Sequence, residues 1–363
     1  MEKKIIIKPK KSILDIRPYI PGKSGSKNNK KIIKLSSNET PLGTSPKALK
    51  ILKESFSASR YPDGSSNDLR KLLAHKFKIN MNNIICGNGS DEVLSLFAQC
   101  FSGPGDEVIY SKHGFLVYPI AIKAAGSKPI SAPEKNYKAD VNAILKKVTK
   151  KTKICFIANP NNPTGTYLTQ NELIKLRENL PNKCLLVIDS AYAEYVNEDD
   201  YTDGFNLVKK YNNVACTRTF SKIYGLAALR IGWAYSSKEI IELMNRVRLP
   251  FNLNTLGQKA AIEAIKDQNF VNRAKNHNKK WKPYIEKQLN QIGLETISGV
   301  ANFVLVKFKN EKQANSCYAF LEKNNIYVRK IAEYGLPNFL RITVGLKSEN
   351  IILCKLIVKF IKK

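Results

Sequence analysis

Short apolar runs that alternate with segments of helical pattern constrain the fold of this chain more than any other feature. The runs lie at residues 83–86, 107–110, 153–158, 183–188, 213–217 and 231–235. The helical patterns lie at residues 66–77, 90–101, 115–125 and 169–180. Strands that are apolar on both faces and are joined by helices predict a mostly parallel sheet with helices on both sides, an α/β fold.

Polar side chains follow several of these predicted strands. Ser90, Asn162, Asp189, Tyr192 and Lys222 all lie at or just past a predicted strand end. In open α/β sheets, ligands bind beyond the carboxyl ends of the strands. We therefore expect these residues to form one site.

Lys222 lies in the segment 219–232, Thr-Phe-Ser-Lys-Ile-Tyr-Gly-Leu-Ala-Ala-Leu-Arg-Ile-Gly, on a turn between two buried runs. One interpretation is a surface lysine in a loop, as for most lysines of this chain. The other is a lysine that forms a Schiff base with a carbonyl cofactor, while Ser221 and Arg230 hold the phosphate of that cofactor. The segment by itself leaves both interpretations open.

A glycine-rich turn precedes the helix that is predicted from residue 90. Gly87-Asn-Gly-Ser-Asp-Glu92 would place bare backbone amides at a helix N-terminus, which is a ready site for an anion. A dinucleotide fingerprint requires a third glycine at position 92, where this chain has glutamate. The pattern therefore favours a phosphate cradle over an NAD site.

Asp189 ends the buried run Leu-Leu-Val-Ile-Asp, where an unpaired carboxylate is costly. It caps a turn or pairs with a protonated pyridine nitrogen, and the latter contact keeps such a ring electron-withdrawing. Tyr192 and Asn162 could hydrogen-bond the phenolate oxygen of the ring and lower the pKa of the Schiff base. Phe115 could stack on the ring, although core packing explains Phe115 and Tyr192 as well.

Composition excludes some classes of function and leaves one alternative. The net charge of +30, from 60 Lys and Arg against 30 Asp and Glu, raises the possibility of a nucleic-acid-binding protein. The basic residues are spread over the whole chain and no nucleic-acid-binding motif is present, so this role is disfavoured. The seven cysteines form no CxxC pair, which predicts free thiols and no metal site. No apolar run is long enough to span a membrane, and the N-terminal apolar patch is too short for a signal peptide, so we expect a cytoplasmic protein.

The remaining patterns predict the division into domains. Residues 1–44 are predicted to be an N-terminal arm and part of a small domain, 45–252 a large cofactor-binding domain, and 253–363 a small C-terminal domain. Strands near 302–308, 327–330 and 340–344, with helices at 311–323 and 348–362, make the latter a smaller α/β unit.

Three motifs carry a family resemblance: Asn159-Pro-Asn-Asn-Pro-Thr-Gly165, Asp189-x-Ala-Tyr192, and Ser221-Lys-x-x-Gly-Leu-Ala-x-x-Arg230-x-Gly. The chain resembles pyridoxal-phosphate-dependent aminotransferases of fold type I. Segments 17–23, 35–39, 60–62 and 340–345 resemble, more narrowly, the histidinol-phosphate aminotransferases. The resemblance spans about residues 17 to 360. It implies a large domain with a mostly parallel seven-stranded sheet between helices, a smaller α/β domain, and a homodimer with a shared active site.

The resemblance also implies a role for individual residues. Lys222 would form the Schiff base with pyridoxal 5′-phosphate and move the proton of the substrate. The phosphate would be bound by Ser221, Arg230, the amides of Ser90 and Asp91, the supporting Thr219, and Tyr61 from the partner subunit. Asp189 would pair with the pyridine nitrogen, Asn162 and Tyr192 with the phenolate oxygen, and Phe115 would stack on the ring. The substrate would be bound by Arg341, Arg329, Tyr19 and Asn38. One departure is Ser190, where many relatives carry glutamate.

The expected reaction is amino transfer between L-histidinol phosphate and 2-oxoglutarate by a ping-pong mechanism, in histidine biosynthesis. Two activities on the same fold stay open as alternatives, those of an aromatic-amino-acid aminotransferase and of a threonine-phosphate decarboxylase.

Overall fold

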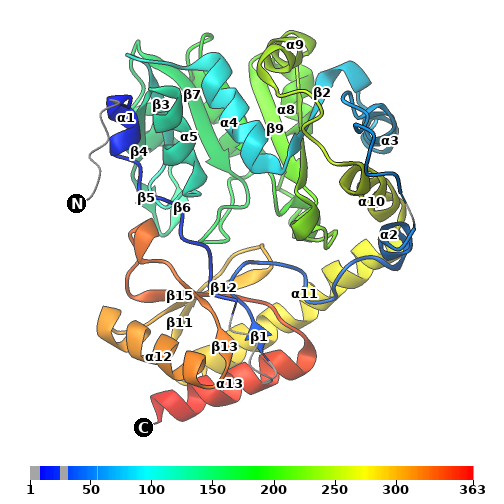
Figure 1. Ribbon diagram of the computed structural model, residues 1–363. Coiled ribbons are helices and arrows are strands. Elements are labelled where there is room, and N and C mark those ends of the chain that lie inside the picture. Colours follow the sequence, from blue (N-terminus) through cyan, green and yellow to red (C-terminus); the bar gives the residue numbers. More distant parts are fainter. Residues whose placement is uncertain (1–8, 25–31, 55, 363) are drawn as a thin grey trace, which may run out of the picture.

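The structure, a computed structural model, describes residues 9–24, 32–54 and 56–362. It has two lobes, each built on one sheet (Figure 1). The larger sheet has seven strands in the order β2-β10-β9-β8-β7-β3-β4. These strands are β2 (Ile84–Asn88), β3 (Glu107–Ser111), β4 (Lys128–Ala132), β7 (Thr152–Ala158), β8 (Leu185–Asp189), β9 (Val214–Thr219) and β10 (Ile231–Ser236). Only β10 runs antiparallel to its neighbours, which confirms the prediction of a mostly parallel seven-stranded sheet.

Helices cover both faces of the large sheet and bury its apolar residues in two clusters. One face packs against α4 (Ser90–Phe101), α5 (Val117–Ala125) and α9 (Lys238–Val247). The other face packs against α3 (Asn67–Phe77), α6 (Val141–Leu145), α7 (Gln170–Asn179), α8 (Phe205–Lys210) and α10 (Thr255–Lys266). Because the strands inside the sheet are buried on both sides, the sheet requires this double cover.

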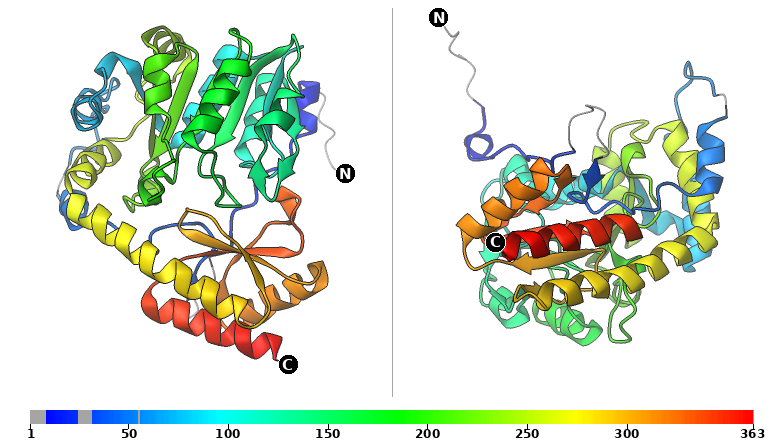
Figure 2. Two further views of the ribbon diagram at one scale, coloured as in Figure 1. Left: turned by 180° about the vertical axis from the view of Figure 1, so that it is seen from behind. Right: turned by 90° about the horizontal axis from the view of Figure 1, so that it is seen from below.

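The smaller lobe holds an antiparallel sheet in the order β11-β12-β15-β14. Its strands are β11 (Glu295–Ile297), β12 (Phe303–Lys307), β14 (Arg329–Lys330) and β15 (Phe339–Thr343). Its helices are α11 (Gln268–Asn290), α12 (Glu311–Lys323) and α13 (Lys347–Ile361). The long helix α11 runs from the edge of the large lobe to the small one, as the left view in Figure 2 shows.

The N-terminal segment belongs to both lobes. The short helix α1 (Lys11–Leu14) lies beside α5, whereas β1 (Ile33–Lys34) pairs in parallel with β13 (Ile326–Tyr327) of the small lobe. Helix α2 (Pro46–Leu52) then begins at the cap Ser45, as the sequence predicts. The domain boundaries stay predictions, and the first helix after residue 252, α10, shares the core of the large sheet.

The helix predicted from Phe115 is misplaced at its start, because α5 begins at Val117 and Phe115 lies in the turn before it. The sequence analysis also missed β4, a strand at the edge of the sheet. Lys128, Pro129 and Ser131 interrupt its apolar pattern, which is tolerated at an edge, where one side of the strand has no partner. Over the residues described, no helix is both long and apolar enough to cross a membrane.

Candidate active site

Most of the predicted site residues line one cavity of about 420 Å³ at the carboxyl edge of the large sheet, where the small lobe faces it. They are Tyr19, Asn38, Ser90, Asp91, Phe115, Asn162, Asp189, Tyr192, Thr219, Ser221, Lys222, Arg230 and Arg341. The convergence follows from topology. Strands β2, β7, β8 and β9 all end at this edge, and the antiparallel β10 begins there, directly after Arg230.

One end of the cavity is a cradle of backbone at the start of α4. Gly89, with φ +82°, precedes the first helical residue, Ser90, and a Cβ at Gly89 would lie 2.5 Å from the Arg230 guanidinium. A Cβ at Gly232 would lie 2.2 Å from the amide nitrogen of Ser90. Two glycines therefore keep this helix N-terminus bare, so that its free amides can bind an anion.

Arg230 is the cation of the cradle. Its Nη2 atom lies 3.0 Å from the Asp91 carboxylate, and its Nη1 donates to Ser221 Oγ at 3.3 Å. The Thr219 hydroxyl accepts the backbone N–H of Ser221 at 3.1 Å, which fixes the turn before Lys222. These side chains supply hydroxyl and guanidinium donors on one side of the bare helix N-terminus, a donor set that suits a phosphate.

Asp189 lies on the floor of the cavity and is 5% exposed. Tyr118 Oη donates to one of its carboxylate oxygens and Thr217 Oγ1 to the other, each at 3.0 Å. Burial raises the pKa of the Asp189 carboxyl to about 6, although both hydrogen bonds oppose the rise. The carboxylate is thus oriented by two neutral donors and forms no ion pair with any residue that the structure describes, which makes it suited to pair with a positively charged ring nitrogen.

Lys222 projects into the same cavity. Its Nζ donates to the Ser37 carbonyl at 3.2 Å and lies 5.7 Å from the centre of the Tyr192 ring. Burial and, second to it, the Arg341 guanidinium lower the pKa of the Lys222 amine to about 8. About a tenth of this amine is therefore uncharged at pH 7, far more than for an ordinary lysine, and the uncharged form is the one that a nucleophile or base requires.

The small lobe contributes Arg341 from β15. This side chain is 5% exposed, donates to the Asn162 amide oxygen, and donates to the Ser36 carbonyl at 2.8 Å. Because Arg341 occupies the oxygen of Asn162, the NH2 group of that amide is the part left to face a ligand. The Nε atom of Arg341 is buried and has no hydrogen-bond partner in the structure.

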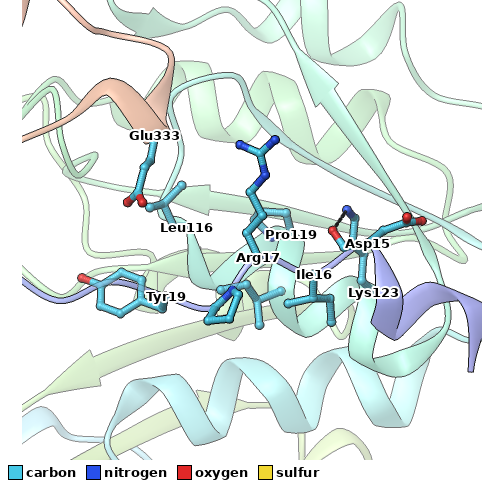
Figure 3. Close-up of a pocket in the computed structure, with 10 residues that line it drawn as sticks. Asp15, Ile16, Arg17, Tyr19, Leu116, Pro119, Lys123 and Glu333 are labelled. Carbon is cyan, nitrogen blue, oxygen red and sulfur yellow. Dashed lines mark hydrogen bonds between the residues drawn. The ribbon is translucent and has the colours of Figure 1, made fainter. Parts of the chain in front are cut away.

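Tyr19 lines the cavity, and the buried Arg329 lies against the Tyr19 ring. The Arg329 guanidinium lies 5.6 Å from the centre of the Tyr19 ring and 3.5 Å from the Glu333 carboxylate. Tyr19 and Ile120 also line a second cavity of about 260 Å³ under the N-terminal arm (Figure 3). Arg329 does not line the main cavity, so it reaches the site only through its contact with Tyr19.

Tyr61, like Arg329, is a predicted site residue that does not line the cavity. It is 82% exposed, and its ring stacks on Phe251 with the ring centres 4.5 Å apart. Ser190, which departs from many relatives, is fully buried and donates to the Asp203 carbonyl at 3.0 Å.

The sequence analysis missed Tyr118 and Thr217, which orient Asp189. Thr217 could have been found from spacing, whereas Tyr118 could not. Thr217 lies two residues before Thr219 and therefore on the same face of β9. Tyr118 follows Phe115 by three residues, but its role is to hydrogen-bond Asp189, which lies 71 residues further along the chain.

Comparison with known proteins agrees with this geometry. The family model for class I and II aminotransferases matches residues 30–355. The histidinol-phosphate aminotransferase of Paramagnetospirillum magneticum is 46% identical over 345 residues, 94% of this chain and 95% of the relative. That of Maricaulis maris is 45% identical over 347 residues, 95% of this chain and 96% of the relative.

The chain belongs to the histidinol-phosphate aminotransferases, within the class I and II aminotransferase family. The solved histidinol-phosphate aminotransferase of Sinorhizobium meliloti, a complex with pyridoxal-5′-phosphate, is 26% identical. It superposes with a TM-score of 0.86 over 92% of both chains. This aminotransferase therefore has the fold type I architecture and depends on pyridoxal phosphate.

The residues present fit that cofactor. The glycine cradle with Arg230 and Ser221 suits its phosphate, and the buried Asp189 suits a protonated pyridine nitrogen. Lys222, an amine with a lowered pKa, lies in the same cavity. Among the described residues, this aminotransferase has no cluster of three His, Cys, Asp or Glu that could hold a metal ion.

Proposed function

We propose that this aminotransferase exchanges the amino group between L-histidinol phosphate and 2-oxoglutarate, giving imidazole-acetol phosphate and L-glutamate, in histidine biosynthesis. The named relatives of 45–46% identity over nearly the whole chain support this substrate. The observation that carries the chemistry is the position of Lys222. Its amine has a pKa of about 8 and shares one cavity with Asp189 and Arg341.

The side chains divide the work by their chemistry. The α4 N-terminus, Ser221 and Arg230 hold the phosphate of the cofactor, and Asp189 holds its ring nitrogen. When bound, pyridoxal phosphate supplies a ring that withdraws electrons from the reacting carbon. Lys222 Nζ is the base that removes the proton from the amino-bearing carbon of the substrate, because it is the amine of the cavity and its pKa is lowered toward neutral pH.

Anion binding falls to the arginines. The buried guanidinium of Arg341 can grip the carboxylate of 2-oxoglutarate through two N–H groups, although it must then release Asn162 or Ser36. Tyr19 lines the cavity with Arg329 against its ring, and we infer that this pair meets the anionic group of a longer substrate. A substrate that carries a phosphate can therefore be distinguished from one that ends in an aromatic ring alone.

A donor panel with 2-oxoglutarate tests the assignment. L-histidinol phosphate should be turned over with the highest kcat/KM, above L-phenylalanine and L-histidinol, and Lys222→Ala should lose at least about 10²–10⁴-fold in rate. Faster turnover of phenylalanine would favour the aromatic aminotransferase. Release of CO2 from threonine phosphate without any keto acid would favour the decarboxylase. Protein that takes up no pyridoxal phosphate would end the proposal.

The same proposal includes a homodimer with a shared site. The exposed Tyr61, stacked on Phe251 beside the exposed Leu249, is an aromatic and apolar surface that a second copy would cover. In that dimer, Tyr61 would reach the phosphate of the cofactor in the partner subunit.

Mixing two inactive variants tests the shared site. Tyr61→Ala removes the donated residue and Lys222→Ala removes the base. A mixed dimer of the two variants contains one site with both residues intact and one site that lacks both. After mild dissociation and remixing, about half of the dimers should be mixed. The activity should therefore rise to at most about a quarter of the wild-type value. No restoration in a confirmed mixed dimer would place Tyr61 in its own subunit's site or in neither.

The cytoplasmic location also stays a prediction.

A further inference from the structure

Asn38 connects the small lobe to Tyr192 through an unusual set of contacts. It is 1% exposed and holds a left-handed φ of +59°, a conformation that asparagine tolerates better than most residues. Its Nδ2 donates to Tyr192 Oη at 2.8 Å. Its Oδ1 accepts from Thr343 Oγ1 at 3.2 Å, and its backbone N–H donates to the same hydroxyl at 3.0 Å.

These contacts fix the direction of the hydrogen bond to Tyr192. Because the Thr343 hydroxyl donates to Asn38 Oδ1, the NH2 group of the amide must face Tyr192. The Tyr192 oxygen therefore acts as the acceptor toward Asn38. Its own hydroxyl hydrogen remains available, and the residue lines the cavity, so Tyr192 can donate to a ligand there.

Thr343 lies on the same strand as Arg341, two residues further on and hence on the same face. Arg341 contacts Asn162, and Thr343 contacts Asn38, which contacts Tyr192. One strand of the small lobe therefore supports both of the side chains that are suited to donate to the phenolate oxygen of the cofactor. Hydrogen bonds in such buried chains strengthen one another.

We propose that Thr343, acting through Asn38, is a positioning residue that sets how strongly Tyr192 donates to the cofactor and thereby how readily the nitrogen of Lys222 loses its proton in the loaded enzyme. Asn38, which the sequence predicts to contact the substrate and which lines the cavity, is then also a link between Thr343 and Tyr192. The inference rests on the cofactor chemistry of the proposed function, but not on the identity of the amino donor.

The test is a pH titration of the visible absorption of the cofactor-loaded protein. Thr343→Val keeps the shape of the side chain and removes its hydroxyl, so the midpoint should rise by about half to one pH unit, as expected for a weakened hydrogen bond. Thr343→Ser should restore the wild-type midpoint. Asn38→Asp, which replaces the donor toward Tyr192 by an acceptor, should raise the midpoint further, because the tyrosine hydroxyl would then donate to the carboxylate.

The matched control is Thr152→Val. The Thr152 hydroxyl is also buried and accepts a hydrogen bond from the backbone N–H of Thr149 at 2.9 Å, and Thr152 begins β7 at the amino end of the strand, away from the site. The midpoint of the absorption titration of loaded Thr152→Val should equal that of the wild type. A wild-type midpoint in loaded Thr343→Val and Asn38→Asp, or an equal shift in Thr152→Val, would overturn the inference. Wild-type protein that does not bind pyridoxal phosphate would instead overturn the proposed function, so the two failures are distinguishable.

Discussion

At the scale of single residues, the chemistry of the site depends on two ionisable groups that burial moves toward neutral pH from opposite sides. Burial lowers the pKa of the Lys222 amine to about 8 and raises the pKa of the Asp189 carboxyl to about 6. Burial makes the charged form of each group costly in the cofactor-free protein, and the bound cofactor would remove part of this cost. Perturbed groups of this kind gather at functional sites at the expense of stability.

The reactivity of Lys222 gives the first prediction. In cofactor-free protein, reductive methylation of Lys222, followed by mass spectrometry, should rise with pH to half its maximum near pH 8. Arg341→Met should move this midpoint upward, because the guanidinium is the second cause of the lowered pKa. A wild-type midpoint near the ordinary lysine value of about 10.4 would contradict the burial argument.

Asp189 gives a prediction on stability. Its pKa is higher in the folded than in the unfolded chain, so the folded state holds the extra proton and the free energy of unfolding falls as pH rises from about 4 to about 6. Above that window the cost is about 3 kcal/mol. Cofactor-free Asp189→Asn should therefore be more stable than wild type at pH 7.5 by about 2–3 kcal/mol, with little difference near pH 4. Denaturant unfolding at both pH values measures this.

The control for that measurement is Asp199→Asn, a change at an exposed carboxylate, which should alter stability by no more than about 0.5 kcal/mol. Equal stability of the wild type and Asp189→Asn at both pH values would show that the buried charge of Asp189 does not destabilise the fold. Loaded with pyridoxal phosphate, the asparagine variant should lose its advantage, because it lacks the charge that pairs with the ring nitrogen.

At the scale of elements, the close contact of β10 with the start of α4 forms the phosphate cradle. A Cβ at Gly232 would meet only backbone, at 2.2 Å from the Ser90 nitrogen and 2.4 Å from the Gly89 carbonyl carbon. Gly232→Ala should therefore displace the helix N-terminus, destabilise the protein by about 1–3 kcal/mol, and weaken binding of pyridoxal phosphate at least tenfold. Calorimetric unfolding and a cofactor titration measure the two effects.

Gly103→Ala is the matched control, because a Cβ there has nothing within 4 Å and Gly103 does not have a left-handed φ. It should leave cofactor affinity unchanged and stability unchanged or slightly raised. If Gly232→Ala bound the cofactor as well as Gly103→Ala does, the cradle would not depend on the close approach of β10 to the start of α4.

At the scale of the whole molecule, the net charge of +30 should act on the rate of encounter with anionic substrates. Between about 0.01 and 0.15 M salt, the screening length falls from about 30 Å to about 8 Å. We expect kcat/KM for 2-oxoglutarate and for histidinol phosphate to fall several-fold over this range, and that for histidinol, a cation without the phosphate, not to fall. Equal salt dependence of all three would show that the charge does not steer substrates.

Local patterns in the sequence predict much of this architecture. Continuous apolar runs between helical patterns predict the mostly parallel sheet, and the motifs around Asn162, Asp189 and Lys222 predict which strand ends carry the chemistry. These features are local, since a strand buried on both faces or a glycine turn before a helix is readable in a short window. The edge strand β4 was not predicted, because its unpaired side tolerates a proline and a charged residue, and these interrupt the apolar pattern of a strand.

The sequence by itself therefore determined the fold class and the family, and it predicted the residues that would hold the cofactor. Only the tertiary structure decided how these residues are held: Tyr118 and Thr217 on Asp189, Asn38 and Thr343 behind Tyr192, and Tyr61 on the outer surface of its own chain. The physical reason is distance along the chain. Asn38 and Thr343 are 305 residues apart, and Tyr118 and Asp189 are 71 apart, so these hydrogen bonds exist only once the two lobes and the sheet have formed.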